Sequence, residues 1–311
     1  MELGIPRCVK DFMKQTLSVL IFFLFITGCS TPDVMAFFAT QTPTPTITPT
    51  PTATFTVSPT PTLTLTPTVT PTLFPTATAT PKWAVKGPGK ITCPILLYHH
   101  IKTPDVPNEY FVTPEDFRAQ MQALKDWGYT TIPISLLITA INDGAPMPEK
   151  PIVISFDDGD ISVYNTAYPI MKEFGFVGVN YLVGNRLESD GFMNVAQIKE
   201  LMAAGWEVGS HSMTHIDLTQ SPDISWELTQ SKADLKEALG VKILSFAYPF
   251  GSKSDDIINK VSKVYIAGVG LGVYVEQGLD NIYYLWRRPV PYGIDMATFA
   301  SYLPGSLPPG Q

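Results

Sequence analysis

Cysteine is scarce in this chain of 311 residues, which contains only Cys8, Cys29 and Cys93. Cys8 falls in a predicted leader and Cys29 at its predicted cleavage point, so one thiol remains for the rest of the chain. An exported domain with one free cysteine has no internal disulfide, and core packing must stabilise it. Cys93 precedes a predicted strand, where we expect a small buried residue rather than a nucleophile.

Positive charge is also in short supply, because 21 lysines and arginines face 28 aspartates and glutamates, giving a formal net charge of -7. The excess belongs to the residues from 82 onward, since bases and acids balance before that point. Phosphate binding needs a basic surface, so nucleic acid is not an expected partner. A neutral glycan remains compatible, and the sequence indicates no obligate protein partner.

The N-terminal region has no apolar run long enough for a transmembrane helix. Three bases precede the run 17–26, which is shorter than the roughly twenty residues that span a bilayer. The segment Ile26-Thr27-Gly28-Cys29 resembles the lipobox of bacterial lipoproteins, in which the peptide is cut before the cysteine and the thiol is acylated. We predict a signal peptide over 1–28, a lipid on Cys29 and an extracytoplasmic, membrane-anchored protein. An ordinary signal peptide or a short anchor helix is the alternative.

Residues 41–81 carry no charge, but they contain eighteen threonines and ten prolines. Frequent prolines block helices and sheet pairing, so we expect a disordered, extended linker that reaches on the order of 100 Å. We assign residues 29–81 to the lipidated linker. Residues 82–311 form one domain, long enough to bury a large α/β core.

From residue 91 onward, strand-like apolar runs alternate with segments of helical spacing. We expect strands over 95–98, 129–134, 152–156, 177–183, 206–209, 243–248, 265–269 and 283–286. We expect helices over 114–127, 166–174, 195–204, 224–239 and 254–264. Such alternation implies a parallel sheet, and a count near seven or eight strands favours a barrel over an open sheet.

Histidine is rare as well, and all four histidines follow predicted strands: His99, His100, His211 and His215. The acidic pair Asp157-Asp158 also ends a predicted strand. The C-terminal strand ends of a parallel barrel converge on the face that carries function. Metal-competent side chains from three strands should therefore meet at one mouth.

Two of the histidines have the spacing of metal ligands. His211 and His215 are four residues apart and can meet one ion if the segment turns helically. Together with Asp158 they make a two-histidine, one-carboxylate set that leaves metal positions open for water and substrate. We expect one divalent metal, zinc in the first place, with iron(II), cobalt and nickel also compatible. The simpler alternatives are an Asp-Gly turn and a solvated polar loop.

The remaining candidates are expected to support the reaction. Only one of His99 and His100 should reach the substrate, because adjacent side chains alternate, and it could protonate a leaving amine. In the turn 247–251, Tyr248 and Phe250 offer aromatic faces to sugar rings, and a backbone N–H there could stabilise an oxyanion. The simpler alternatives are capping of the strand by both rings and core packing plus a turn.

A last pair of candidates is basic. Arg287 and Arg288 end the last predicted strand, and one guanidinium could orient Asp157 by a bidentate bond while the other is a surface charge.

Three segments together resemble the polysaccharide deacetylases of carbohydrate esterase family four. They are the motifs SFDDG at 155–159, HSMTH at 211–215 and AYPFG at 247–251, and the similarity extends over 91–300. The resemblance implies a distorted (β/α)7 TIM-like barrel. It also implies that Asp157 is the general base and that Asp158, His211 and His215 hold the metal.

The sequence departs from the common pattern of this family in two places. The acid histidine of the family lies near the C-terminus, yet no histidine follows His215. The order is similar instead to the poly-β-1,6-N-acetylglucosamine deacetylases, whose Tyr-His motif lies on the N-terminal strand. That match implies His99 as the acid and His100 as a supporting or substrate-binding residue. The arginine of the third motif is absent, and Arg288 is our candidate to replace it.

The resemblance implies a metal-dependent hydrolase that removes N-acetyl groups from a polysaccharide, with poly-N-acetylglucosamine, peptidoglycan and chitin oligomers all open. An O-acetyl esterase acting on acetylated xylan or another glycan would keep the same fold. It would need His99 less, because an alkoxide leaves more readily than an amine anion. An iron(II) oxygenase is disfavoured by the second acid beside Asp158, and a non-catalytic glycan-binding protein has no need of an acid and a base.

Overall fold

A computed structural model describes residues 82–305 of the chain. The predicted signal peptide, the predicted lipidation of Cys29 and the linker at 29–81 lie outside the described residues, so these assignments and the domain boundaries stay predictions. Within 82–305, no helix combines the length and the apolar character needed to cross a membrane. Cys93 is completely buried and forms no disulfide in this part of the chain.

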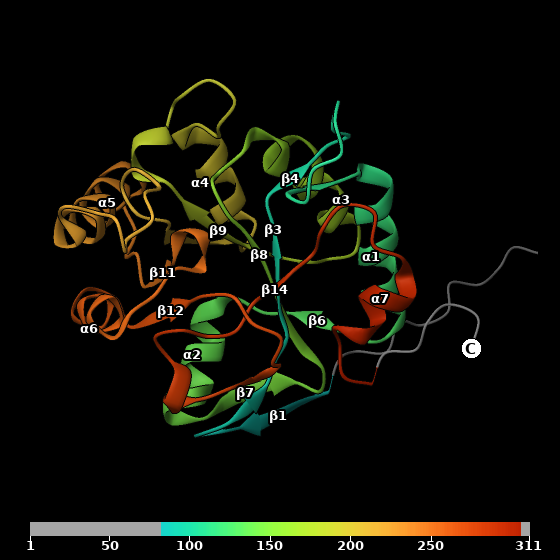
Figure 1. Cartoon of the computed structure of the whole chain (residues 1–311). Coiled ribbons are helices and arrows are strands. Elements are labelled where there is room, and N and C mark those ends of the chain that lie inside the picture. Colours follow the sequence, from blue (N-terminus) through green and yellow to red (C-terminus); the bar gives the residue numbers. More distant parts are fainter. Residues whose placement is uncertain (1–81, 306–311) are drawn as a thin grey trace, which may run out of the picture. The chain divides into compact units, whose positions relative to one another are not determined.

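Seven parallel strands form the centre of the fold and follow one another around it in chain order (Figure 1). They are β3 (Ile95–Tyr98), β8 (Pro151–Phe156), β9 (Val179–Leu182), β10 (Glu207–Ser210), β11 (Ser245–Ala247), β12 (Ala267–Val269) and β14 (Arg288–Pro289). The last strand pairs with the first, and a parallel bridge between Val269 and Leu285 joins β12 to the residues before β14. The ring of strands is thereby closed, which confirms the distorted (β/α)7 barrel.

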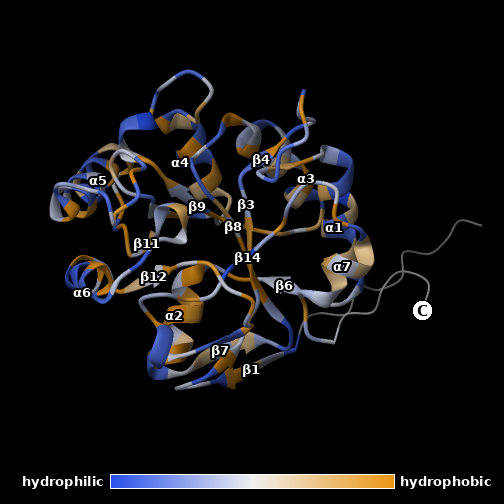
Figure 2. Ribbon diagram, viewed as in Figure 1, coloured by the Kyte–Doolittle hydropathy of each residue, from blue (hydrophilic) through white to orange (hydrophobic). Residues whose placement is uncertain are grey.

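Helices surround the strands, and their apolar residues face inward (Figure 2). They are α1 (Pro114–Asp126), α2 (Ile134–Asp143), α3 (Tyr168–Glu173), α4 (Val195–Ala203), α5 (Ile224–Leu239), α6 (Asp255–Val264) and α7 (Met296–Ser301). In α1 the predicted apolar face is fully buried, through Phe117, Met121 and Leu124. The Thr113 side chain caps the helix by accepting a hydrogen bond from the Asp116 N–H.

Short elements complete the framework around the barrel. They are β1 (Trp83–Lys86), β2 (Ile91–Thr92), β4 (His100–Ile101), β5 (Phe111–Val112), β6 (Thr130–Thr131), β7 (Ala145–Pro148), β13 (Glu276–Gln277), a π-helix η1 (Val163–Ala167) and 3-10 helices η2 (Gly184–Arg186), η3 (Pro249–Gly251) and η4 (Leu279–Asn281). The two-residue β6 extends the sheet beside β8, and β1 pairs with β7 in a separate antiparallel sheet. Two of these elements, β4 and η3, contribute residues to the pocket at the barrel mouth.

Two expected strands differ from the structure. The run 129–134 gives only the two residues of β6, because Ile134 begins α2, a helix that is not among the predicted ones. The final strand begins at Arg288 rather than at residue 283, and Leu285 contributes a single bridge. The second difference decides which of two neighbouring arginines faces the barrel interior.

Candidate active site

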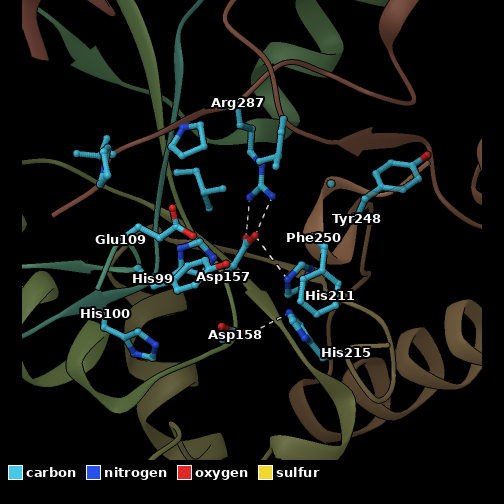
Figure 3. A pocket seen from close by; sticks show the side chains of 17 residues that line it. His99, His100, Glu109, Asp157, Asp158, His211, His215, Tyr248, Phe250 and Arg287 are labelled. Carbon is cyan, nitrogen blue, oxygen red and sulfur yellow. Dashed lines mark hydrogen bonds and ion pairs between the residues drawn. The ribbon is translucent and has the colours of Figure 1, made fainter. Parts of the chain in front are cut away.

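The carboxyl ends of the strands surround a pocket of about 390 Å³. Its lining includes nearly every candidate from the sequence: His99, His100, Asp157, Asp158, His211, His215, Tyr248 and Phe250 (Figure 3). These residues come from β3, β8, β10 and β11 or from the segments that directly follow them. The convergence at one mouth that the strand ends predict is therefore present.

The acidic pair splits toward two different partners. β8 ends at Phe156, and Asp158 has a φ of 71°, a left-handed conformation that turns the chain sharply. Figure 3 shows the Asp157 carboxylate beside Arg287 and the Asp158 carboxylate beside His215. Neighbouring acids can therefore have separate roles in the same pocket.

Asp157 is buried and forms a bidentate pair with Arg287. The guanidinium donates from Nη1 to Oδ1 at 2.6 Å and from Nη2 to Oδ2 at 2.8 Å. Burial raises the pKa of Asp157, but Arg287 and His211 outweigh burial and bring this pKa down to about 2. The carboxylate is therefore ionised at neutral pH, with both oxygens fixed in orientation.

The prediction that Arg288 fills this role is wrong. Its guanidinium lies 4.1 Å from the centroid of the Tyr302 ring, whereas Arg287 is 1% exposed and reaches Asp157. The reason is the alternation of neighbouring side chains on an extended segment, which directs Arg287 inward and Arg288 away from it. The expectation that one of the two arginines forms a bidentate bond with Asp157 is met by Arg287.

Asp158, His211 and His215 form a group that fits a metal ion. One ligand atom from each residue lies within 4.8 Å of the other two, and His215 Nε2 is 3.2 Å from Asp158 Oδ1. His211 Nδ1 is 2.8 Å from the Ala247 carbonyl oxygen, which can only accept, so Nδ1 carries the proton and Nε2 has a free lone pair. Two imidazoles and a carboxylate suit zinc and related divalent ions.

The segment that carries both histidines is not helical, although we expected a helical turn to bring the two rings to one ion. Residues 211–217 contain no helix, and Ser212 and His215 have φ values of 65° and 62°. The two rings nevertheless approach within 4.8 Å between centroids. Burial and the neighbouring His211 lower the pKa of His215 to about 4, so this imidazole is neutral and able to ligate at neutral pH.

His99 and His100 diverge, as expected for neighbours on an extended chain. The His99 ring contacts the edge of Tyr110 at 5.0 Å between centroids, and burial lowers the pKa of His99 although Asp157 and Asp158 oppose this. His100 Nδ1 lies 2.9 Å from Asp160 Oδ2. Burial raises the pKa of Asp160, but hydrogen bonds from His100 and Ser162 hold it well below its usual range. His100 is thus engaged with a carboxylate, and His99 remains free to meet a substrate.

Tyr248 and Phe250 contribute differently from each other. Tyr248 is 1% exposed, and its N–H donates to the Val269 carbonyl at 3.1 Å, so that group is not available. Phe250 is 60% exposed and left-handed, with its ring 4.7 Å from that of His215. Its N–H makes no hydrogen bond with any residue in 82–305. The free backbone donor of this turn therefore belongs to Phe250.

Two residues at or beside the pocket carry no signal in the sequence. Arg186, in η2, donates from Nη1 to Asp158 Oδ1 at 2.8 Å, although it lies 28 residues further along the chain. Glu109 lines the pocket from the loop before β5. Arg186 comes soon after the predicted strand 177–183, but neither residue belongs to a recognisable motif, so only the folded arrangement reveals them.

The chain is similar in sequence and in fold to known polysaccharide deacetylases. A sequence profile described as "Polysaccharide deacetylase" matches residues 144–269. The Bacillus subtilis (strain 168) protein YxkH, named after the polysaccharide deacetylases, is 29% identical over 220 residues, which cover 68% of this chain and 75% of that protein. The poly-beta-1,6-N-acetyl-D-glucosamine N-deacetylase of Staphylococcus epidermidis is 26% identical over 200 residues, covering 54% and 68%. The crystal structure of a polysaccharide deacetylase from Bacillus cereus superposes with a TM-score of 0.62 at 26% identity and covers 68% of this chain and 69% of that chain.

Proposed function

Because the chain belongs to the polysaccharide deacetylase family, we propose that it hydrolyses N-acetyl groups of an N-acetylglucosamine-containing polysaccharide. One observation carries the proposal. An ionised, buried carboxylate on Asp157 and the three potential metal ligands Asp158, His211 and His215 line one pocket. The similarity to the deacetylase of Staphylococcus epidermidis, whose name gives poly-β-1,6-N-acetylglucosamine as its substrate, supports this choice of glycan.

Asp158, His211 and His215 would hold one divalent cation, and zinc is the ion we propose. When bound, such a cation supplies Lewis-acid polarisation of a carbonyl oxygen and lowers the pKa of water. The chain prepares this site in two ways. The Ala247 carbonyl fixes the tautomer of His211, and the lowered pKa of His215 keeps its ring unprotonated.

The remaining residues handle protons and developing charge. Asp157 accepts a proton from the water that attacks the acetyl carbon, while Arg287 keeps both carboxylate oxygens in place. The Phe250 N–H is placed to donate to the oxygen of the tetrahedral intermediate. His99 then protonates the departing glucosamine nitrogen. Burial lowers the pKa of His99, so its protonated form gives up the proton readily.

Acetate release from a glycan panel tests the function. The panel contains poly-N-acetylglucosamine, peptidoglycan, chitin oligomers and acetylated xylan, each assayed with and without a chelator. We expect chelator-sensitive release from an N-acetylated glycan and a loss of at least about a hundredfold in Asp157→Asn, the scale of a lost general base. Release from acetylated xylan alone would replace the proposal by an O-acetyl esterase, and full activity of Asp157→Asn would remove the base assignment.

We further propose that the enzyme lies outside the cytoplasm and is attached to the membrane by a lipid on Cys29. The segment Ile26-Thr27-Gly28-Cys29 and the uncharged Thr/Pro composition of 41–81 support this. Metabolic labelling with a radioactive fatty acid tests it, with the wild type labelled and Cys29→Ala unlabelled. Equal labelling of the two proteins would contradict the anchor.

A further inference from the structure

The segment 211–215 holds two ligands of the proposed metal site in an unusual backbone conformation. Ser212 and His215 are both left-handed without being glycine. L-residues rarely adopt this conformation, and it persists only where the surroundings enforce it. The contacts around this segment therefore determine whether the two imidazoles are in place before a metal arrives.

Glu227, in the first turn of α5, supplies the main contact on one side of this segment. Its Oε2 accepts hydrogen bonds from the N–H groups of Met213 and Thr214, both at 2.9 Å. Its Oε1 accepts one from the Thr214 hydroxyl at 2.6 Å. All three donors lie between the two histidines in the chain, and Glu227 does not line the pocket.

The burial of the Glu227 carboxylate indicates that its contact with the segment is a structural one and not a chance surface contact. Glu227 is 4% exposed, and a buried carboxylate is costly unless hydrogen-bond donors surround it. The three donors of the segment provide that environment, and the N-terminal end of α5 adds a favourable helix dipole. Conversely, loss of the carboxylate leaves two backbone N–H groups of the segment without their acceptor.

A different element binds the carbonyl groups of the segment. The carbonyls of Ser212 and Met213 accept from the N–H groups of Gly184 and Asn185, at 3.0 and 2.9 Å. The same element, η2, carries Arg186, which contacts Asp158. The carbonyl groups of the segment are thus bound to η2, and its N–H groups are bound to Glu227. Loss of Glu227 should therefore release the N–H groups while the hydrogen bonds to η2 persist.

We propose that Glu227 is a positioning residue that holds His211 and His215 in their metal-binding arrangement. The inference rests on the proposed metal site. It adds a residue that touches neither the metal nor the substrate and acts through the backbone of the segment between the ligands. Its removal should weaken metal binding far more than it changes the fold.

Zinc affinity, measured by competition with a chromophoric chelator, tests this role without reference to activity. We expect Glu227→Leu, whose side chain has no acceptor for these donors, to bind zinc about 10- to 100-fold more weakly than the wild type, the usual effect of removing a residue that orients metal ligands. Glu237→Leu, which changes an exposed acid on the same helix, is the matched control and should bind like the wild type. Absorption of the cobalt-substituted proteins should change shape only in Glu227→Leu. Wild-type affinity in Glu227→Leu would overturn the proposal.

Substitutions at Thr214 keep the test decisive if Glu227→Leu does not fold. Thr214→Val loses the hydroxyl that donates to Glu227, whereas Thr214→Ser keeps it. We expect weaker zinc binding in the first and wild-type binding in the second, and equal affinities would overturn the proposal. A wild type that binds zinc but releases no acetate would refute only the proposed function. A wild type that binds no zinc would refute both proposals.

Discussion

The two sides of the pocket are built by different means. On one side, Asp157 and Arg287 come from β8 and the approach to β14, and they are 2% and 1% exposed. On the other side, Asp158 and His215 lie beyond strand ends in left-handed conformations, with side chains 14% and 16% exposed. The barrel itself fixes the base, whereas hydrogen bonds with α5 and η2 hold the segment 211–215 that carries two of the metal ligands.

This difference indicates that the two sides should fail differently when they are altered. A change beside Asp157 exposes the barrel interior to an unpaired charge, so stability and catalysis should fall together. A change among the metal-binding loops alters contacts near solvent, so metal affinity should change while the barrel persists. The following predictions separate the two responses.

The largest effect is expected for Arg287→Met, which removes the partner of Asp157. An unpaired buried carboxylate costs about 3–5 kcal/mol, so the free energy of unfolding should fall by that amount and catalysis should be lost. Urea denaturation measures the first effect and acetate release the second. Arg287→Lys keeps the charge without the bidentate geometry, and we expect its unfolding free energy and its activity to lie between those of the wild type and Arg287→Met. Wild-type stability in Arg287→Met would contradict the importance of the pair.

A smaller effect is expected from acid. The pKa of Asp157 is about 2 in the folded chain against 3.8 for a free aspartate, because Arg287 and His211 outweigh burial. Because the pKa of Asp157 is lower in the folded than in the unfolded chain, its ionisation stabilises the fold at a pH above the unfolded pKa. This contribution to the free energy of unfolding, about 2 kcal/mol, disappears as the pH falls from about 4 toward about 2. Urea denaturation at several pH values should show this loss in the wild type and not in Asp157→Asn. Parallel curves for the two proteins would contradict the assignment.

The smallest effect is expected for Arg186→Gln on the metal side. The guanidinium bonds Asp158 Oδ1, and a positive charge there opposes a cation at the same oxygen. Zinc binding, measured by chelator competition, should become tighter by only about severalfold, since Arg186 is partly solvent-exposed and its charge is screened. Unfolding free energy should not change. Weaker zinc binding would instead show that Arg186 holds Asp158 in its ligating orientation.

Much of the fold could be predicted from the sequence because its elements have strong local signals. The bounds of β3 and α5 match the predicted ranges 95–98 and 224–239. In contrast, α2 was missed although Ile134, Leu137, Ile138 and Ile141 have helical spacing, because its first residue continues the apolar run 129–134 and its N-terminus has no side-chain cap. A helix that begins directly after a strand-like run and has no side-chain cap is therefore easily read as part of that strand.

The candidate site was predictable to the extent that it depends on strand ends. Asp157, Asp158 and the histidines could be placed together because parallel strands deliver their C-terminal residues to one face. The choice between Arg287 and Arg288 depends on the orientation of a two-residue strand, which sequence does not fix. Arg186 and Glu227 act through contacts between separate segments, and such contacts have no local pattern.

The burial of Cys93 has a consequence for where this domain can mature. Burial raises the pKa of its thiol far above the ordinary value, so the reactive thiolate is suppressed. Since residues 82–305 also contain no disulfide, their native state owes nothing to oxidation. The same barrel can therefore form in reducing and in oxidising surroundings, and reductants should leave its metal ligands and its base in place.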